Sequence, residues 1–362
     1  MKNIAVFYGG KSVEHDVSVI TGVMTVNSLD KEKFNAVPVY VAKNGGWYTG
    51  EVLKDPDAYS SLSLKKLKKL TVVSGENALY EKKRGRLKLL CSVYCAINCM
   101  HGERGEDGSL AGVLNMCDIP CASPDITSSA LAMDKAFTKA AMKGAGIKVL
   151  PFMIYGGGKR TEEPKFGYPV IVKPVKGGSS VGVGKAENKE EFVKALSYAL
   201  KFGEKAIVEP LLSDFTEINC AAYKKNGEIK VSLCDRPRGR TEILTFSDKY
   251  EGGKREFPAK IDFNVAAKIR TLTERAYRIF GFRGVIRIDY FVKDKTIYLN
   301  EINSVPGSLA YYLFYDTLSG FKTMLSEIIE EGVKEFSVHS TEIKEFDSGI
   351  LSFCGAKGVK QL

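Results

Sequence analysis

The chain has 362 residues, which is more than one ordinary hydrophobic core supports and predicts two or three domains. Hydrophobic residues make up 44% and charged residues 27%, which is typical of a globular protein. The N-terminal apolar run is too short for a signal peptide, and no stretch reaches the length of a membrane span. We therefore expect a cytoplasmic protein without membrane contact. The net charge of +10 is spread along the chain instead of gathered in a stripe or tail, which argues against nucleic-acid binding.

Residues 1–125 have the pattern of an α/β unit. Strands are expected at 4–8, 37–41 and 89–100, with an amphipathic helix after the first. This alternation favours a mainly parallel sheet that binds ligands at the carboxyl ends of its strands, where the polar loops 9–16 and 101–108 begin. Four lysines alternate with leucines and predict a solvated helix face: Lys65, Lys66, Lys68 and Lys69. The eight cysteines lack paired CxxC spacing and are interpreted as small buried hydrophobes.

Two further segments follow, at 126–213 and 214–337. In the first we expect a helix over 127–144, capped by Thr127 or Ser128, then strands at 149–154, 168–173 and 206–209 and a helix over 189–201. The second has strands at 217–223 and 229–234, a long polar loop to 258, a helix from 262 and a β-hairpin over 284–303. Residues 338–362 show weak periodicity and are a tail without an assigned role.

The hairpin carries a constellation of acidic and amide side chains. Residues two apart on a strand share a face, so a tight turn centred on Lys295 sets Asp289 opposite Glu301 and Arg287 opposite Asn303. Two facing carboxylates repel each other, and a hard cation such as Mg²⁺ removes that repulsion. The alternative is a solvated hairpin face on which Arg287 simply neutralises Asp289. The following Pro306-Gly307 favours the metal site, because a glycine lets its backbone approach a ligand closely.

A glycine-rich loop follows the strand that ends at Lys173 and Pro174. The run Lys176-Gly177-Gly178-Ser179-Ser180-Val181-Gly182 offers backbone N–H groups that suit phosphate oxygens. Its spacing matches neither the P-loop nor the dinucleotide-binding pattern. The alternative is a flexible hairpin turn, and the lysine at the strand end favours a nucleotide.

Taken together, these motifs resemble the ATP-grasp fold and, within it, the D-alanine–D-alanine ligase family. The resemblance extends over residues 3–310 in the order of the family's motifs. The matching segments are 9–14 with Val17-Ser18, 101–108, Met133-Asp134-Lys135, Val172-Lys173-Pro174, 178–182, Asp248-Lys249-Tyr250, Arg287-Ile288-Asp289 and 300–303. The resemblance implies an α/β protein, an N-terminal parallel α/β domain followed by a two-lobed ATP-grasp unit. It also implies an ATP-dependent ligase of peptidoglycan precursor synthesis that joins two D-amino acids through an acyl phosphate, usually as a homodimer.

The resemblance also implies a role for each matching residue. ATP is held by Lys135, Lys173, Ser180 and Lys249, with Glu209 at the adenine and Glu217 near the ribose. Two Mg²⁺ or Mn²⁺ ions are bound by Asp289, Glu301 and Asn303. Glu14 holds the ammonium of the first amino acid near His101, and Glu14, Ser179 and Tyr250 form a network that closes the long loop. Arg287 and the Gly307 N–H stabilise the tetrahedral oxyanion, and Ser308 and Tyr312 lie on the second-substrate side.

The chain departs from the family at the second-substrate side. An ungapped count places Tyr312 where the family has a serine that grips the carboxylate of the second substrate. Three hypotheses therefore stay open. The chain is a D-alanine–D-alanine ligase, which the Lys249-Tyr250 pair favours; or it is a related ATP-grasp ligase with a different acceptor; or it is an ATP-binding module that no longer ligates.

Overall fold

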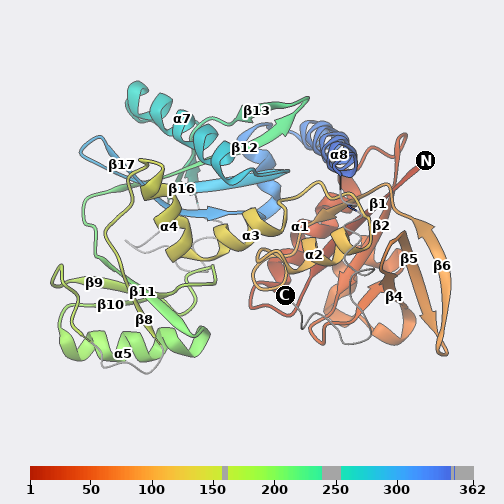
Figure 1. Cartoon of the computed structure of the whole chain (residues 1–362), viewed down its shortest axis with the longest axis horizontal. Helices are drawn as coiled ribbons and strands as arrows, with labels where there is room; N and C mark the ends of the chain where they lie inside the picture. The colour runs from red at the N-terminus through yellow and green to blue at the C-terminus, as the bar shows by residue number, and fades with distance from the viewer. Residues whose placement is uncertain (157–161, 239–253, 344–345, 347–362) are drawn as a thin grey trace, which may run out of the picture.

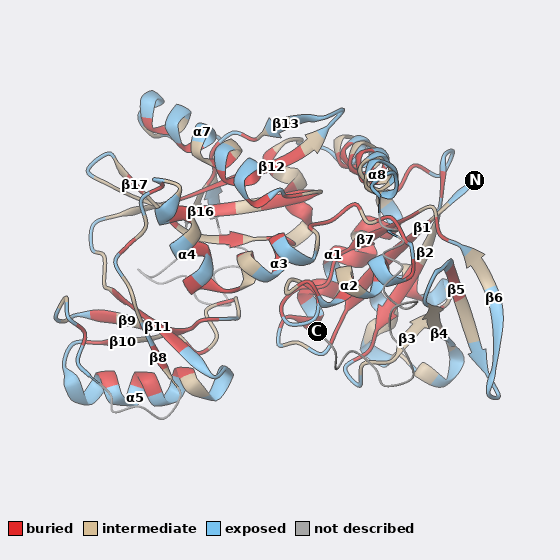
Figure 2. Cartoon of the chain, viewed as in Figure 1, coloured by how far each residue is buried: buried red, intermediate tan, exposed pale blue. Residues whose placement is uncertain are grey.

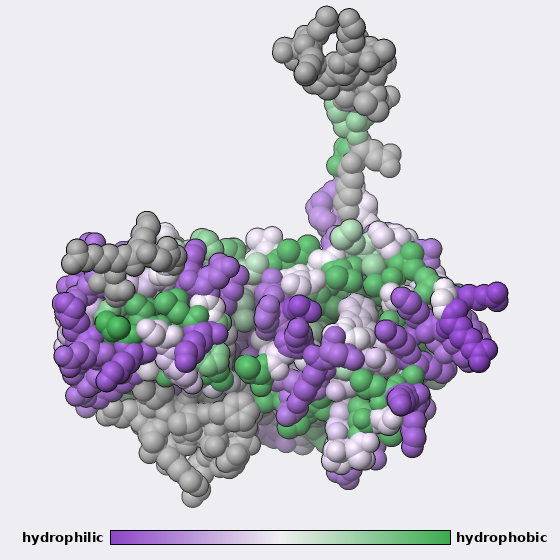
Figure 3. All heavy atoms as spheres, turned by 90° about the horizontal axis from the view of Figure 1, so that it is seen from below, coloured by the Kyte–Doolittle hydropathy of each residue, from purple (hydrophilic) through white to green (hydrophobic). Residues whose placement is uncertain are grey.

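The computed structural model describes residues 1–156, 162–238, 254–343 and 346. Figure 1 shows an N-terminal domain on one side and two further lobes on the other, with the long C-terminal helix α8 against the N-terminal domain. Within the described residues, no helix combines the length and the apolar character needed to cross a membrane. Hydrophilic side chains cover much of the face in Figure 3, and apolar side chains form separated patches among them.

The N-terminal domain is built on a seven-stranded sheet in the order β6-β5-β4-β3-β2-β1-β7. Strand β1 is parallel to both β2 and β7, as the sequence predicts, whereas β3 to β6 are antiparallel. The bounds of its strands are β1 Lys2–Gly9, β2 Phe34–Val41, β3 Trp47–Thr49, β4 Lys68–Val73, β5 Glu76–Lys83, β6 Arg86–Ser92 and β7 Cys95–Asn98. The sheet is therefore mixed, and its parallel part supplies the loops that the motifs occupy.

Helices cover both faces of that parallel part. Helix α1 (His15–Ser28) and helix α8 (Leu318–Ser340) share one apolar core with β1, and α2 (Ser109–Met116) covers the opposite face. Short 3₁₀ helices, η1 Glu51–Lys54, η2 Pro56–Ser61 and η3 Leu64–Lys66, connect β3 to β4. Because α8 belongs by sequence to the C-terminal lobe, its packing joins that lobe to the N-terminal domain.

The central lobe is a four-stranded antiparallel sheet in the order β10-β9-β11-β8, with α5 packed on it. Its elements are α3 Ile126–Met133, α4 Lys135–Gly144, β8 Met153–Gly156, β9 Val170–Pro174, β10 Gly184–Ala186, α5 Lys189–Ala199, η4 Leu200–Phe202 and β11 Lys205–Pro210. Figure 2 shows that the buried residues of α5 face the strands.

The C-terminal lobe has a second four-stranded antiparallel sheet, in the order β13-β12-β16-β17, and a small sheet of β14 and β15. Its elements are β12 Thr216–Lys225, β13 Glu228–Val231, β14 Arg236–Arg238, β15 Lys254–Glu256, α7 Phe263–Phe280, β16 Val285–Lys293, β17 Thr296–Asn303 and η5 Gly307–Leu313, followed by α8. The two four-stranded sheets and their helices form the two lobes that the resemblance implies.

Several expected elements differ from the structure. The helix expected over 127–144 is two helices, because Asp134 breaks it and caps α4 by accepting the backbone N–H of Ala136 and Phe137 at 3.0 Å. Asp125, not Thr127 or Ser128, caps α3. The strand expected over 89–100 is interrupted between Ser92 and Cys95. The lysine and leucine run forms η3 and the start of β4 instead of a helix, and α8 crosses the expected boundary at 337.

Candidate active site

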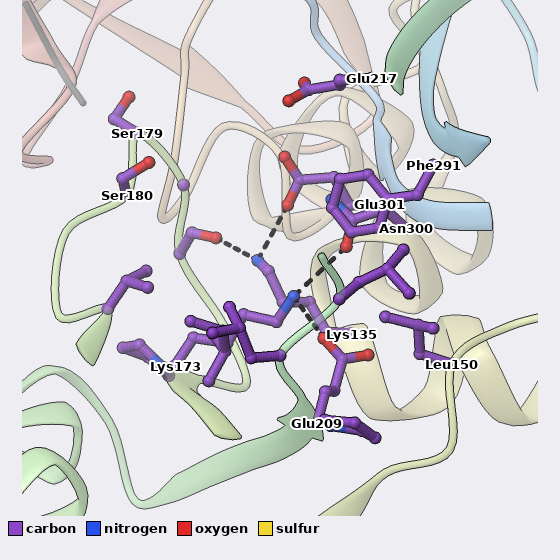
Figure 4. A pocket seen from close by; sticks show the side chains of 18 of the residues that line it. Lys135, Leu150, Lys173, Ser179, Ser180, Glu209, Glu217, Phe291, Asn300 and Glu301 are labelled. Carbon is purple, nitrogen blue, oxygen red and sulfur yellow. Dashed lines mark hydrogen bonds and ion pairs between the residues drawn. The ribbon is translucent and has the colours of Figure 1, made fainter. Parts of the chain in front are cut away.

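A cavity lies between the central and C-terminal lobes, and its walls combine apolar and cationic side chains. Leu150, Ile171 and Phe291 give it an apolar part suited to a planar base. The side chains of Lys135 and Lys173 give it a cationic part, and the glycine-rich loop closes that side. Figure 4 shows the two lysines pointing toward the hairpin, with Ser179 and Ser180 on the opposite side.

A buried ion-pair network fixes Lys173. The carboxylate of Glu209, which is 2% exposed, lies 2.6 Å from Lys139 Nζ and 2.6 Å from Lys173 Nζ. Burial alone raises the pKa of this carboxyl group, but the two ammonium groups outweigh it and lower the pKa to about 2. Burial lowers the pKa of Lys139. Lys173 also donates to Asn300 Oδ1 at 3.3 Å, which connects β9 to the hairpin (Figure 4).

The glycine-rich loop meets the N-terminal domain. Ser179 and Ser180 have φ values of 52° and 57°, in the left-handed region that side chains rarely adopt. The Ser179 hydroxyl donates to Glu14 Oε1, and the backbone of Gly178 lies beside the same carboxylate. Lys135 Nζ donates to the Gly177 carbonyl. Two members of the expected network, Glu14 and Ser179, are therefore in contact, while its third member, Tyr250, and the expected ATP ligand Lys249 lie outside the described residues.

The register of the hairpin is confirmed. Strands β16 and β17 pair Asp289 with Glu301 and Arg287 with Asn303. The turn itself contains two residues, Asp294 and Lys295, both with positive φ, instead of being centred on Lys295. A bulge after Asp289 adds one residue to β17, because Tyr290 pairs with Leu299 and leaves Asn300 as the extra residue. The bulge restores the expected pairing at the acids and places both Asn300 and Glu301 at the cavity.

The carboxylates of the hairpin suit a hard cation whose remaining ligands are phosphate oxygens. Asp289 is 1% exposed, accepts two hydrogen bonds from Arg287 at 2.7 and 2.9 Å, and accepts one from Asn303 Nδ2 at 3.1 Å. Glu301 lies 3.6 Å from Lys135 Nζ. Among the described residues no cluster contains three histidine, cysteine or acidic side chains suited to a metal. Two carboxylates and an amide leave part of a coordination shell to other oxygens, as Mg²⁺ sites on nucleotides do.

The remaining expected residues surround the loop that leaves the hairpin. His101 is buried, hydrogen-bonds to Thr21 Oγ1 at 3.0 Å and to the backbone of Val305, and burial lowers its pKa to about 4. The Ser308 N–H donates to the same Thr21 hydroxyl at 3.1 Å. A Cβ on Gly307 would meet nothing within 4 Å, so open space lies beside that backbone. Tyr312 hydrogen-bonds to the half-buried Arg287, and Glu217 lies at the cavity opposite Phe291 on β16 (Figure 4).

Three further side chains complete the site and were not among the predicted residues. Lys139 and Asn300 belong to the network around Lys173. The partly buried carboxylate of Glu106 accepts the N–H of Gly102 at 2.8 Å and of Val305 at 3.1 Å, and so fastens the 101–108 loop to the end of β17. The sequence signals for Glu106 were its position in the polar loop 101–108 and the match of that segment to the family's motif.

A two-lobed cavity with facing lysines, a glycine-rich cover and an acidic hairpin defines the ATP-grasp class of nucleotide-dependent enzymes. Two family models match the chain: the D-ala D-ala ligase N-terminus over residues 3–124 and the D-ala D-ala ligase C-terminus over residues 141–331. The chain belongs to the D-alanine–D-alanine ligase family, a family of ATP-dependent ligases.

Individual relatives agree with this assignment. The D-alanine–D-alanine ligase of Thermosipho melanesiensis is 35% identical over 97% of this chain and 98% of its own length. The crystal structure of the D-alanine–D-alanine ligase from Helicobacter pylori has a TM-score of 0.78 at 28% identity, covering 91% of this chain and 98% of that one. The VanG D-Ala:D-Ser ligase from Enterococcus faecalis has a TM-score of 0.76 at 26% identity, covering 92% and 99%.

Proposed function

We propose that the chain joins two D-alanine molecules to D-alanyl-D-alanine with ATP as the energy source. The observation that carries this proposal is the pairing of Asp289 with Glu301 directly beside two cavity lysines, Lys135 and Lys173. This arrangement places positive charge and metal-binding oxygens around one point, where a terminal phosphate is transferred. Family membership supports the ligase reaction, and the known activity after which these relatives are named supports the substrate.

ATP lies with its base between the lobes and its phosphates toward the hairpin. The apolar walls hold the adenine near Glu209, and Glu217 binds the ribose. Lys135, Lys173 and Ser180 hold the phosphates, and Lys249 reaches them from the long loop. Asp289, Glu301 and Asn303 would hold Mg²⁺ or Mn²⁺, which would supply positive charge against the phosphates. The network around Glu209 prepares this site in advance, because Lys173 is already fixed in the orientation that Figure 4 shows.

The first D-alanine binds beside Glu14, whose carboxylate holds its ammonium group, near the His101 loop. An oxygen of its carboxylate attacks the γ-phosphorus, the bond from that phosphorus to ADP breaks, and an acyl phosphate forms. The amine of the second D-alanine then attacks the acyl carbon. Arg287 and the Gly307 N–H stabilise the oxyanion, and inorganic phosphate leaves with the bonding electrons. The contact between Ser179 and Glu14 holds the glycine-rich loop over the site and limits the access of water to the acyl phosphate.

A second candidate function is ligation to a different acceptor. The observation that favours it is Tyr312 at the position of the family's serine, together with the structural likeness to a D-Ala:D-Ser ligase. An ATP-binding module without ligase activity is disfavoured, because the chain retains the lysines at the cavity and the paired acids and Arg287 of the hairpin that the proposed reaction uses.

Phosphate release from ATP separates these candidates. The enzyme is supplied with Mg²⁺ and ATP and with a panel of D- and L-amino acids, singly and in pairs, and the products are identified by mass spectrometry. Release with D-alanine alone, together with D-alanyl-D-alanine, supports the proposed reaction. Release only with a mixed pair supports a different acceptor, and ATP binding without release from any pair supports the module.

The proposed product is a precursor of peptidoglycan, so we place the enzyme in the cytoplasm, where ATP and free amino acids are available. Its partners are these small molecules. A homodimer is the expected assembly, and light scattering after size-exclusion chromatography measures its mass. A mass of one chain across micromolar concentrations contradicts that expectation.

A further inference from the structure

A second arginine, Arg255, lies against the ring of Tyr312, on the expected acceptor side of the site. The guanidinium carbon of Arg255 is 4.4 Å from the centroid of the Tyr312 ring and 5.6 Å from that of Phe257. A cation at this distance from an aromatic face is attracted by the ring and kept in place by it. Arg255 lies on β15 and is exposed, so one face of its guanidinium is available to a ligand while the other is stacked.

Tyr312 is placed by an unusual stretch of backbone. Ser308, Leu309 and Ala310 have φ values of 52°, 48° and 48°, a left-handed turn of three residues none of which is glycine. This conformation is unfavourable for residues other than glycine and persists only where the surroundings enforce it. The bond from the Ser308 N–H to Thr21 is one such constraint. Strain of this kind is typical of functional sites, and here it leads directly to Tyr312.

Arg287, the residue expected to stabilise the oxyanion, is largely committed to the hairpin. Its Nε and Nη2 both donate to Asp289, at 2.7 and 2.9 Å, and its guanidinium also hydrogen-bonds to Tyr312. A guanidinium presents two bidentate edges at most, and one of these is occupied by Asp289. A carboxylate bound near Tyr312 therefore competes with Asp289 and Tyr312 for the donors of Arg287, and a second guanidinium gives it a further bidentate partner. Arg255 is the cation that stacks on the same tyrosine.

We propose that Arg255, held against the Tyr312 ring, binds the carboxylate of the acceptor amino acid, in place of the serine hydroxyl that this chain lacks. Arg287 then remains beside Asp289 to stabilise the oxyanion. The acceptor must carry a free carboxylate in this arrangement, because an uncharged group gains neither the charge nor the paired hydrogen bonds of a guanidinium. This inference rests on the proposed function, since it assigns the second substrate of that reaction.

An internal competition assay measures the acceptor's carboxylate directly. The enzyme receives ATP, Mg²⁺, D-alanine and D-alaninamide together. D-Alaninamide has no carboxylate to phosphorylate and acts only as an acceptor, so the two products are D-alanyl-D-alanine and D-alanyl-D-alaninamide. Mass spectrometry with isotope-labelled standards gives their ratio, which is the preference for an acceptor carboxylate. Because both products come from one sample, partial misfolding of a variant lowers both and leaves the ratio unchanged.

Wild-type enzyme is expected to favour D-alanyl-D-alanine strongly. A charge-assisted hydrogen bond contributes roughly 1.5–3 kcal/mol, so Arg255→Met lowers the preference roughly 10- to 100-fold. Arg255→Lys retains the charge without the planar fork and gives an intermediate ratio, which also decides the matter if the Met variant forms no product. The matched control is Arg236→Met on the neighbouring strand β14, whose guanidinium lies 3.8 Å from Glu256. It removes the same charge and leaves the ratio unchanged.

The possible failures are distinguishable. If wild-type enzyme forms neither product, the proposed function is wrong. If it forms D-alanyl-D-alanine and Arg255→Met and Arg255→Lys both keep the wild-type ratio, the proposed function stands and the assignment of Arg255 is overturned. An equal loss of preference in Arg236→Met also overturns it, because the effect then follows the overall charge of the small sheet.

Discussion

Glu209 holds two buried lysines at once, and replacing it with glutamine tests that arrangement. Glu209→Gln preserves size but leaves the fully buried Lys139 without a countercharge. At 2.6 Å and an effective dielectric constant near 20, the attraction is roughly 6 kcal/mol before desolvation is subtracted. Breaking a buried pair from one side costs about 3–5 kcal/mol. Burial already lowers the pKa of Lys139, so in the variant this lysine can lose its proton, which limits the destabilisation. We therefore expect the free energy of unfolding to fall by about 3 kcal/mol.

The order of the variants by free energy of unfolding is a stricter test than the value for Glu209→Gln alone. Lys139→Met removes the buried charge itself and leaves Glu209 paired with Lys173 at 2.6 Å, so it costs only about 1 kcal/mol. The double variant Lys139→Met with Glu209→Gln is then more stable than Glu209→Gln alone. Urea unfolding followed by circular dichroism measures the free energies, with Glu274→Gln on the exposed face of α7 as the control for removing a carboxylate.

Two results refute this reasoning. The first is a Glu209→Gln variant within about 1 kcal/mol of wild type, which means that Lys139 is solvated or neutral already. The second is a double variant no more stable than Glu209→Gln alone. That result means that the glutamine destabilises the fold by disturbing packing, and not by leaving the Lys139 ammonium group without a countercharge.

Three further outcomes are expected. The pKa of Glu209 is lowered in the folded protein, so its stabilisation is complete above the ordinary value of 4.5 and is lost as the pH falls toward about 2; the stability difference between wild type and Glu209→Gln, measured by urea unfolding across pH, should shrink over that window. Glu301→Gln should reduce turnover at least ~100-fold in the phosphate-release assay, and near-normal turnover contradicts the metal assignment. Asn300→Ala removes the contact to Lys173 and should raise the KM for ATP roughly 2- to 10-fold with little change in the KM for D-alanine, whereas equal changes in both argue for a general distortion.

The hairpin shows how much of the site can be predicted from local sequence pattern. Alternation along two strands was enough to predict which acids face each other, although the assumed turn differed from the real one. The bulge at Asn300 compensated for that difference, and its trace is visible in the sequence, where the apolar residues Ile297, Leu299 and Ile302 are spaced by two and then by three. A strand of regular alternation does not change phase in this way, so the spacing itself predicts a bulge.

The ion-pair network was less accessible to sequence analysis. Lys139 and Glu209 are 70 positions apart and belong to different elements, and neither periodicity nor motif spacing states which buried charges meet. The break at Asp134 was readable in principle, because an aspartate before a new helix is a frequent cap. The helical interpretation of the neighbouring residues outweighed it. The missed cap matters for function, since it directs Lys135 into the cavity at the first position of α4.

The strands β4 and β5 and the start of β6 were missed for a different reason. Their exposed residues are rich in lysine and arginine, which suits a solvated helix as well as a sheet edge. Strand β6 is the outermost strand of its sheet, and exposed charges such as Arg86 and Lys88 discourage other chains from pairing with that edge. Sequence pattern alone does not separate these two uses of surface charge. The error left the site unaffected, because the motif loops leave the parallel strands β1 and β7.

The distribution of the site across three parts of the chain has a chemical consequence. Glu14 comes from the N-terminal domain, Ser179 from the central lobe, and Glu301 from the C-terminal lobe, and no part alone surrounds an acyl phosphate. A small cavity lined by Glu14, Glu301 and the glycine-rich loop joins them, and Glu106 fastens the first domain to the end of the hairpin. The reactive intermediate is therefore protected only when all three parts are assembled, so contacts such as the Ser179 bond to Glu14 protect it from water as well as holding the fold together.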